Sequence, residues 1–360
     1  MTETVEMKTG SATPPETKLM KAVFRTRFGP PKVLQLKEVE KPVPTEVRGV
    51  LVKIIAAAVN PADRYDMKGP PLLLRLILPL FKLNMGVFRP KDPVLGSDAS
   101  GRVEAVTDSV TQFKPGDEVF GSCKGSYAEY AVAREDRLVL KPVNCSFDEA
   151  AAVPIAAITA LQALRDHGRI QPGQKVLVNG AGGGVGTYAV QIAKYFGGEV
   201  TAVTNTENLE MVRSLGADHV IDYTKEDYTK NGERYDLICE IAASHGFSAY
   251  KRSLTPGGTF VLVGMRDKII LRLLYFTLLR RLLSGGRKFR FFIAKINQKD
   301  LSILRDMLET RKVRSVIDRR YRLDDVGEAM QYLGEGHARG KIVITVGSEM
   351  NDTSVRGRLR

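Results

Sequence analysis

A glycine-rich stretch between two apolar segments constrains the fold of this chain more than any other feature. The sequence "KVLVNGAGGGVGTYAVQIAKYFGGEVTAV" spans residues 175–203 and has five glycines between Gly180 and Gly186. Each glycine destabilises a strand or a helix by roughly 0.5–1 kcal/mol, so this loop must need a bare backbone. The apolar 175–179 predicts a buried parallel strand, 187–196 has helical spacing, and 199–203 predicts a second strand.

Together these segments form a βαβ unit, which is the context that makes a glycine motif informative. The loop reads AxGxxG from Ala181, with Gly183 and Gly186 in the key places. A bare backbone there lets a pyrophosphate approach the helix N-terminus, where unpaired N–H groups and the helix dipole favour an anion. The alternative is a tight turn without a ligand, although a plain turn does not need five glycines.

The segments that follow predict an α/β fold with a doubly wound parallel sheet. Strand-like runs recur at 219–223, 235–242 and 259–265, and "TPGG" at 255–258 predicts the turn before the last of them. With 360 residues, the chain is long enough for two domains. Its composition, 43% hydrophobic and 26% charged, is typical of a globular protein.

The cysteines and the two ends of the chain favour a cytoplasmic location. Three scattered cysteines without a CxxC pair support neither a zinc ribbon nor a disulfide framework, and free thiols in a reducing compartment are the simpler interpretation. The polar residues 1–19 lack the pattern of a signal peptide. We expect a disordered extension there and a loose tail at 347–360.

Two segments, 70–88 and 269–295, are both apolar and basic. The net charge is +13, and residues 266–299 hold ten Lys or Arg against a single acid, Asp267. Charges interrupt both segments, so neither predicts a transmembrane helix. Three interpretations stay open: the wall of a wide apolar pocket, peripheral contact with an anionic membrane through 269–295, or a dimer contact or ordinary core whose arginines reach water. No nucleic-acid-binding motif accompanies the charge, so we expect no nucleic acid partner.

Beyond these patterns, the motifs "NGAGGGVGTYAVQIAK", "LGADHVIDYTKED" and "LTPGGTFVLVGM" resemble the cofactor domain of medium-chain dehydrogenases/reductases. The resemblance is strongest to the zinc-free quinone oxidoreductase (zeta-crystallin-like) branch, and "AAAVNPADRYDMKG", "PVLGSDASGRVEAV" and "GSYAEYAV" extend it over nearly all of 20–346. It implies a GroES-like β-barrel catalytic domain at 20–143, a Rossmann NAD(P)-binding domain at 144–312, and a return to the catalytic domain at 313–346. It also implies a homodimer, with 259–265 as the candidate sheet edge.

The zinc ligands of related dehydrogenases are not found in this sequence. A catalytic zinc usually has three protein ligands, mostly Cys and His. Asn60 stands in or next to the place of the family's cysteine, and the usual Gly-His-Glu reads Gly96-Ser97-Asp98. The four-cysteine structural loop is absent, and none of the four histidines clusters with a cysteine. We therefore expect no zinc.

Without a metal, the reduction of a conjugated C=C bond is easier than the oxidation of an alcohol. Nothing would lower the pKa of an alcohol, whereas an enolate oxygen needs only hydrogen-bond donors and a later proton. We expect NAD(P)H-dependent hydride transfer to lipophilic quinones or α,β-unsaturated carbonyls. Alcohol dehydrogenase is a weaker alternative, and a weakly catalytic or non-catalytic nucleotide-binding, membrane-associated protein is another, because fold alone does not fix function.

The resemblance identifies Asn60 and Tyr65, in the NPxxxY stretch, as catalytic candidates that face the nicotinamide and the substrate. Tyr65 would donate to the carbonyl oxygen or close the pocket; it is otherwise a tyrosine of the barrel core. Asn60 is otherwise a turn residue before Pro61. Asp63 would orient its neighbours or be exposed. Thr159 matches a position near the nicotinamide, unless its hydroxyl only bonds its own helix.

NADPH is the favoured cofactor, with NADH as the alternative. Val203 and Thr204 occupy the zone where NAD-specific folds place an acid, so no carboxylate blocks a 2′-phosphate there. However, Glu207 stands where relatives often carry Lys or Arg, and Arg213 is one cation that would replace it. The cofactor-binding candidates are Thr159, Ala181, Gly182, Gly183, Gly184, Val185, Gly186, Thr204, Asn205, Tyr223, Val263, Gly264 and Lys341.

Overall fold

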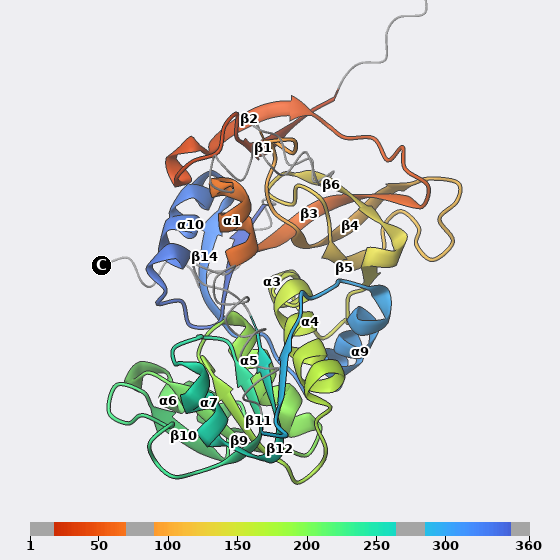
Figure 1. Cartoon of the computed structure of the whole chain (residues 1–360). Coiled ribbons are helices and arrows are strands. Elements are labelled where there is room, and N and C mark those ends of the chain that lie inside the picture. Colours follow the sequence, from red (N-terminus) through yellow and green to blue (C-terminus); the bar gives the residue numbers. More distant parts are fainter. Residues whose placement is uncertain (1–17, 70–89, 264–284, 347–360) are drawn as a thin grey trace, which may run out of the picture.

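The computed structural model describes residues 18–69, 90–263 and 285–346, which form two lobes (Figure 1). The expectations for nearly all of the N-terminal extension, for the segment 70–88, for most of 269–295, for Gly264 and for the C-terminal tail lie outside these residues. Within the described part, no helix is both long and apolar enough to cross a membrane.

One lobe is built on a sheet of six parallel strands, which confirms the predicted doubly wound fold. Counted from β8, the strand order β10-β9-β8-β11-β12-β13 is 3-2-1-4-5-6, the arrangement of dinucleotide-binding folds. The predicted strand 175–179 coincides with β8. The strands are β8 (Lys175–Asn179), β9 (Glu199–Thr204), β10 (His219–Asp222), β11 (Tyr235–Glu240), β12 (Leu254–Leu262) and β13 (Lys288–Phe291).

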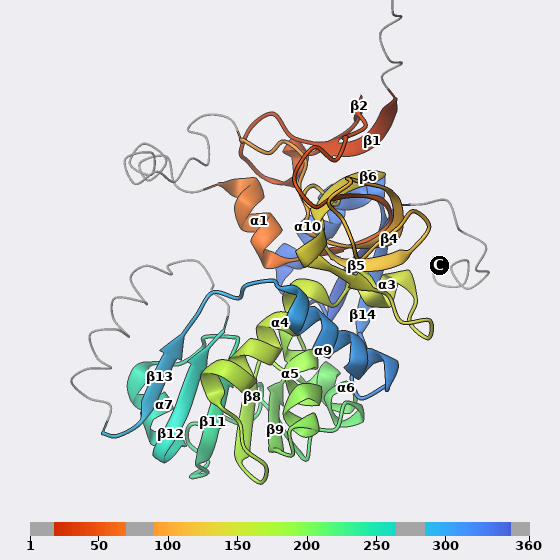
Figure 2. The ribbon, with the colours of Figure 1, turned by 90° about the vertical axis from the view of Figure 1, so that its right-hand side faces the viewer.

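Helices cover both faces of this sheet, as seen in Figure 2. Val176 and Val178 pack in one core cluster with the α4 and α5 helices, while Leu177 between them packs on the opposite side with the aromatic residues of α7 and β12. Neighbouring side chains of a strand point to opposite faces, so burial on both sides requires the continuous apolar run of β8. The helical elements are α4 (Pro154–Gln162), η4 (Ala163–Gly168), α5 (Gly184–Tyr195), η5 (Thr206–Asn208), α6 (Leu209–Ser214) and α7 (Phe247–Ser253).

Strand β12 differs from the prediction in two respects. It lies between β11 and β13, so the expectation that 259–265 forms the sheet edge is wrong, and among the described strands β13 forms that edge. The predicted turn at 255–258 lies inside β12, where the pairing with β11 shifts register and Gly257 has a φ of 80°. The basic, aromatic β13 thus completes the described part of the sheet.

The other lobe contains a mainly antiparallel seven-stranded sheet and a separate β1–β2 hairpin pair. Two C-terminal strands join this sheet, because β15 pairs antiparallel with β3 and parallel with β14. Its strands are β3 (Gly49–Val59), β4 (Asp98–Val106), β5 (Glu118–Ser122), β6 (Tyr130–Arg134), β7 (Leu138–Leu140), β14 (Ile317–Arg322) and β15 (Lys341–Thr345); the pair is β1 (Leu19–Phe24) and β2 (Gln35–Glu40).

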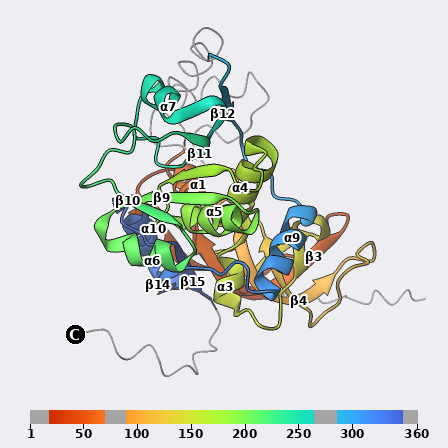
Figure 3. The ribbon, with the colours of Figure 1, turned by 90° about the horizontal axis from the view of Figure 1, so that it is seen from below.

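The two lobes meet where the chain returns to the first sheet. The turn before β15 reaches the glycine loop: the amide of Gly340 donates to the carbonyl oxygen of Gly182 at 2.9 Å. Helix α3 packs against β3 and β4 (Figure 3), whereas α9 contacts β7 and α4. The remaining helical elements are α1 (Pro61–Lys68), α3 (Phe147–Ala151), α9 (Gln298–Glu309), α10 (Val326–Glu335), η1 (Pro31–Val33), η3 (Glu135–Arg137) and η6 (Leu323–Asp325).

Candidate active site

The glycine loop leads into helix α5 with the backbone N–H groups of its first turn uncapped by a side chain. Gly183 is the N-cap residue and has extended dihedrals, φ −87° and ψ 176°. The other predicted cofactor-binding residues of the loop, Ala181, Gly182, Gly184, Val185 and Gly186, are its neighbours in the chain. Because the first four N–H groups of a helix lack partners within the helix, this end of α5 can bind a phosphate.

Two glycines of the loop serve different purposes. A Cβ on Gly186 would lie 2.1 Å from the carbonyl oxygen of Gly180, so the fold itself requires glycine there. A Cβ on Gly183 would have only that same oxygen nearby, at 3.6 Å. The described residues therefore leave the space beside Gly183 open. This space fits a group such as a pyrophosphate that approaches the backbone closely.

The adenosine end of a dinucleotide would lie at the end of β9. Thr204 is buried there, and its carbonyl oxygen accepts from the amide of Tyr223, whose side chain is exposed. Among the described residues, the side-chain oxygens of Asn205 and Asn208 are buried without a hydrogen-bond partner. Buried polar atoms are rarely left unpaired, so these amides fit a site that a polar ligand completes.

A buried polar cluster lies directly beneath the glycine loop. The Lys341 ammonium group donates to Oδ1 of Asn60 and to the carbonyl oxygen of Val59, and it lies 3.7 Å from Oδ2 of Asp98. Asn60 Nδ2 donates to the same Asp98 oxygen at 3.0 Å. A Cβ on Gly184 would meet the Lys341 side chain at 3.0 Å. Lys341 thus connects the cofactor loop to the candidate Asn60.

Asp98 ties this cluster to helix α4. Its carboxylate accepts from the amide of Ile155, in the first turn of α4, at 3.2 Å, where the helix dipole favours a negative charge. Burial raises the pKa of Asp98 and lowers that of Lys341, and the attraction between the two groups opposes both shifts. The cluster therefore joins the ends of β3, β4, β15 and α4.

Asp63 is buried, so the interpretation that it is exposed is wrong. Its carboxylate accepts from the backbone amide of Asn60 and from the Tyr127 hydroxyl, both at 2.8 Å. Burial raises the pKa of Asp63 to about 7, and the Tyr127 hydrogen bond opposes this rise. Sequence reasoning named Asp63 without a firm role and missed Tyr127, because Tyr127 reaches the cluster from a loop far away in the chain.

The remaining predicted residues lie around this centre. Tyr65 is on α1, and its side chain is well exposed. The Thr159 hydroxyl donates to the carbonyl oxygen of Ile155 at 2.6 Å, which is the bond to its own helix that we considered as an alternative. Val263 is buried directly after β12. Gly264 lies outside the described residues.

Another buried carboxylate lies at the switch point of the parallel sheet and was not predicted. Glu240 ends β11, and both of its oxygens accept from Nδ2 of Asn179, at 2.8 and 3.0 Å. The Tyr228 hydroxyl and the Ala243 amide also donate to it. Burial raises its pKa. The sequence signal that could have identified Glu240 is a single acid at the end of an apolar strand. Its carboxylate holds the loops after β8 and β11 together.

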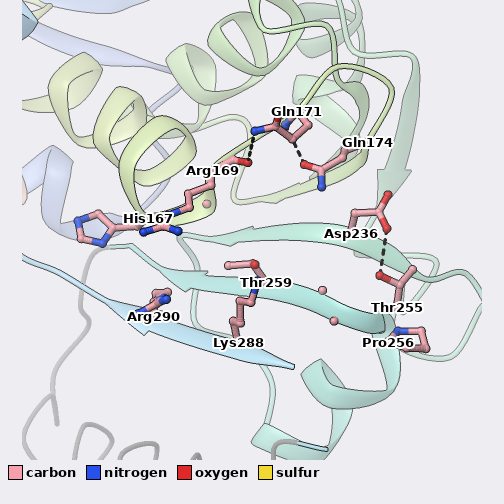
Figure 4. A pocket seen from close by; sticks show the side chains of 13 residues that line it. His167, Arg169, Gln171, Gln174, Asp236, Thr255, Pro256, Thr259, Lys288 and Arg290 are labelled. Carbon is pink, nitrogen blue, oxygen red and sulfur yellow. Dashed lines mark hydrogen bonds between the residues drawn. The ribbon is translucent and has the colours of Figure 1, made fainter. Parts of the chain in front are cut away.

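The described residues contain no group of three His, Cys, Asp or Glu side chains that could hold a metal ion. The three cysteines are all described and are buried free thiols. A cavity of about 400 Å³ lies elsewhere, lined by residues that include Arg169, Asp236, Lys288 and Arg290 (Figure 4). Its lining residues come from the end of η4, the loop before β8 and the starts of β11, β12 and β13, whereas the glycine loop follows the end of β8. This cavity is therefore separate from the candidate active site.

Two family models match this chain. Residues 47–143 match the alcohol dehydrogenase GroES-like domain, and residues 215–344 match the zinc-binding dehydrogenase model. They cover β3 to β7 and, up to residue 344, β10 to β15, but not residues 144–214 with β8, the glycine loop and β9. The GroES-like match, together with the parallel sheet, confirms the predicted combination of a GroES-like and a Rossmann domain.

Curated proteins and solved structures match over almost the whole chain. A chloroplastic quinone oxidoreductase, QR1 of Triphysaria versicolor, is 32% identical over 91% of this chain and 98% of its own length. A chloroplastic NADPH-dependent alkenal/one oxidoreductase of Arabidopsis thaliana is also 32% identical, over 91% and 80%. The quinone oxidoreductase structure from Coxiella burnetii superposes with a TM-score of 0.78 at 29% identity, covering 92% and 100% of the two chains.

Proposed function

Because this chain belongs to the medium-chain dehydrogenase/reductase superfamily, in its zeta-crystallin-like quinone oxidoreductase branch, we propose that it is an NADPH-dependent oxidoreductase. Its substrates are lipophilic quinones or α,β-unsaturated carbonyls, the classes named in its relatives. The observation that carries the proposal is the uncapped N-terminus of α5, which lies against the buried Lys341–Asn60–Asp98 cluster.

In this proposal the chain binds and orients, and the cofactor supplies the reducing equivalents. When bound, a reduced nicotinamide would supply the hydride that reduces the substrate. The loop from Ala181 to Gly186 holds the pyrophosphate, and Thr204, Asn205 and Tyr223 border the adenosine. Val263 and Thr159 would border the nicotinamide. The Tyr65 hydroxyl donates to the substrate carbonyl oxygen, where negative charge develops after hydride transfer to the β-carbon.

We assign Asn60 a positioning role within this scheme. Its side-chain oxygen accepts from Lys341, and its Nδ2 donates to Asp98 and to the carbonyl oxygen of Ala58. Since these bonds use its hydrogen-bonding groups, Asn60 acts by fixing the start of α1, which carries Tyr65 four residues after Pro61. Lys341 belongs to the same positioning cluster.

The reaction in this proposal is independent of zinc. The two positions that correspond to a cysteine and to the acid of the Gly-His-Glu motif are Asn60 and Asp98, and both contact the ammonium group of Lys341. A cation on the chain itself thus already neutralises Asp98. This arrangement supports reduction of an activated C=C bond or a quinone over alcohol oxidation, which a Lewis acid would assist by lowering the pKa of the alcohol.

We further propose a cytoplasmic homodimer that pairs through β13, the edge of the described part of the parallel sheet. An unpaired strand edge offers a row of backbone N–H and C=O groups to a second chain. Light scattering on the purified protein tests the dimer. Peripheral membrane contact through 269–295 stays an alternative, tested by flotation with anionic vesicles.

The experiment for the proposed function is cofactor oxidation by purified protein after EDTA treatment. Short enals, long-chain enones, 1,4-naphthoquinone and simple alcohols serve as substrates, each with NADPH and with NADH. Turnover of enones or quinones after chelation supports the proposal. Activity confined to alcohols and lost on chelation contradicts it. Cofactor binding without any turnover would favour the non-catalytic nucleotide-binding protein instead.

A further inference from the structure

An ion pair at the adenosine end of the candidate cofactor site joins the two lobes. The guanidinium group of Arg339, just before β15, contacts the carboxylate of Glu207 on η5. We propose that Arg339 is the specificity-determining residue that binds the 2′-phosphate of NADPH, and that Glu207 holds its side chain in place before the cofactor arrives. This inference rests on the proposed function and adds a residue to which no role has been given.

The backbone around Arg339 is fixed from two sides. On one side, the neighbouring Gly340 donates to Gly182 at 2.9 Å and forms a parallel bridge with Gly183. On the other side, the Arg339 amide donates to Oδ2 of Asp318 at 3.0 Å, an oxygen that also accepts from the Tyr332 hydroxyl. The position of the turn beside the glycine loop therefore does not depend on the Arg339 side chain.

The contact with Glu207 places the guanidinium group next to the ribose site. In this class of fold the ribose of the adenosine is received at the end of the second strand, here β9, which ends at Thr204. Glu207 is three residues further on, between Asn205 and Asn208, the two residues whose buried side-chain oxygens lack a partner in the described part. Arg339 is thus a cation brought to this site from the other end of the chain.

The charges at this site explain why an acid at position 207 is compatible with NADPH. Alone, Glu207 would repel a 2′-phosphate, but Arg339 neutralises it. Both side chains are exposed, 48% for Arg339 and 67% for Glu207, and exposed ion pairs are weak, so the guanidinium group can exchange partners at little cost. A phosphate has more negative charge than a carboxylate and accepts a two-pronged guanidinium contact.

Other charged groups near this site have partners already. Arg213, the cation considered from the sequence, pairs with Glu210 one helical turn away on α6. The carboxylate of Asp222 accepts from the hydroxyl groups of Thr206 and Thr224 and lies 3.7 Å from Nζ of Lys225. Arg339 also has a partner, but its partner is Glu207, which lies between Asn205 and Asn208 at the end of β9. The position of this contact, rather than the strength of either ion pair, favours Arg339 for the phosphate.

The test measures nucleotide binding to the full chain by calorimetry, with 2′,5′-ADP and 5′-AMP as probes that differ only in the 2′-phosphate, and with NADPH and NADH. The variants are Arg339→Gln, Arg339→Lys and Glu207→Gln, with Arg213→Gln as the matched arginine control. We expect Arg339→Gln to weaken the binding of 2′,5′-ADP and of NADPH about tenfold or more, since a hydrogen bond to a charged group is lost. The affinities for 5′-AMP and NADH should stay within about twofold of the wild-type values. The affinities of Arg339→Lys for 2′,5′-ADP and NADPH should fall between those of the wild type and of Arg339→Gln.

Removing the acid should have the opposite sign: Glu207→Gln should strengthen NADPH binding and leave NADH binding unchanged. The repulsion between the acid and the phosphate is lost, and this outweighs the lost orientation of Arg339 by a weak, exposed ion pair. Equal weakening of all four nucleotides by Arg339→Gln would overturn the inference, and so would unchanged binding or a loss that follows Arg213→Gln instead. Retained NADH affinity in Arg339→Gln also shows that the variant is folded. A wild-type chain that binds neither NADPH nor NADH would contradict the proposed function itself, whereas equal NADH and NADPH affinities that Arg339→Gln leaves unchanged would contradict this inference alone.

Discussion

The ammonium group of Lys341 donates a hydrogen bond to the side-chain oxygen of Asn60, although 281 residues separate them in the sequence. Both residues are almost fully buried. The contact is possible because β15 returns from the nucleotide-binding lobe to pair with β3, whose last residue, Val59, precedes Asn60. The two lobes are therefore connected at the candidate active site by one buried charge and its partners.

Replacing Lys341 with Met should destabilise the protein strongly. The variant leaves Asp98 as a buried carboxylate without its cation, and losing one partner of a buried ion pair costs about 3–5 kcal/mol. Urea unfolding measures the change in the free energy of unfolding. Lys53→Met, at an exposed position of β3, is the control and should change it by less than about 0.5 kcal/mol. A loss below about 1 kcal/mol for Lys341→Met would show that the cluster does not depend on this charge.

The titration of Asp63 should make stability fall as the pH rises. Its pKa is about 7 in the folded protein, above the ordinary value of 3.8, so between these values the folded state binds more protons than the unfolded state. Stability from this group is then full below about pH 4 and is lost as the pH rises through 7. The largest effect is roughly 4 kcal/mol.

The variant Asp63→Asn isolates this effect, because an amide at this position does not titrate and its oxygen can still accept from Tyr127. Urea unfolding at pH 5, 6, 7 and 8 should show the wild type losing stability relative to the variant with increasing pH. Two curves that stay parallel over this range would mean that Asp63 is ionised throughout and that the raised pKa is wrong.

Two alanine substitutions in the glycine loop should separate folding from cofactor binding. Gly183→Ala meets no atom closer than 3.6 Å and has an ordinary φ, so its melting temperature should stay near that of the wild type while its NADPH affinity falls. The Cβ added by Gly186→Ala would lie 2.1 Å from a backbone oxygen, so this variant should lose both thermal stability and NADPH affinity. Thermal melting and calorimetric titration with NADPH measure the two properties. Full NADPH affinity in Gly183→Ala would argue against a pyrophosphate at this position.

Removing the Tyr65 hydroxyl should slow the reaction without loss of stability. Tyr65 is 44% exposed on α1, so Tyr65→Phe removes a donor to the substrate rather than a core contact. Loss of one such donor typically lowers kcat by about 10²-fold or more. Steady-state kinetics with an enone and the Kd for NADPH give the result. Tyr195→Phe, a tyrosine of similar exposure at the end of α5, is the control; equal effects of the two substitutions would remove Tyr65 from the mechanism.

The sequence predicted those parts of the molecule that depend on local patterns. The strand 175–179 and the loop with Gly183 at the start of α5 agree with the structure because apolar runs and glycines determine backbone conformation locally. The predicted sheet edge was wrong because "RKFRF" at 287–291 has the pattern of a basic surface segment. In the structure, its alternate side chains Phe289 and Phe291 pack on the sheet. Only the tertiary fold reveals that β13 pairs with β12 and takes its place at the edge.

The buried cluster could be predicted only in part, for a different reason. Asn60 and Asp98 drew attention because they stand where metal ligands are expected, but nothing near Tyr127 or Lys341 in the sequence indicates burial beside them. These four residues come from separate strands and loops, and long-range pairing of β3, β4 and β15 brings them together. The same holds for Glu207 and Arg339, whose pairing needs the return of the chain to the first lobe.

The central claim is hydride transfer from NADPH to an activated carbon without zinc. The most direct measurement uses NADPH that carries deuterium at the transferable position of the nicotinamide, an α,β-unsaturated ketone, and EDTA-treated protein shown by metal analysis to be free of zinc. We predict deuterium at the β-carbon of the saturated product, with the carbonyl group intact. Product without deuterium, or activity that disappears with EDTA and returns with added zinc, would contradict the account.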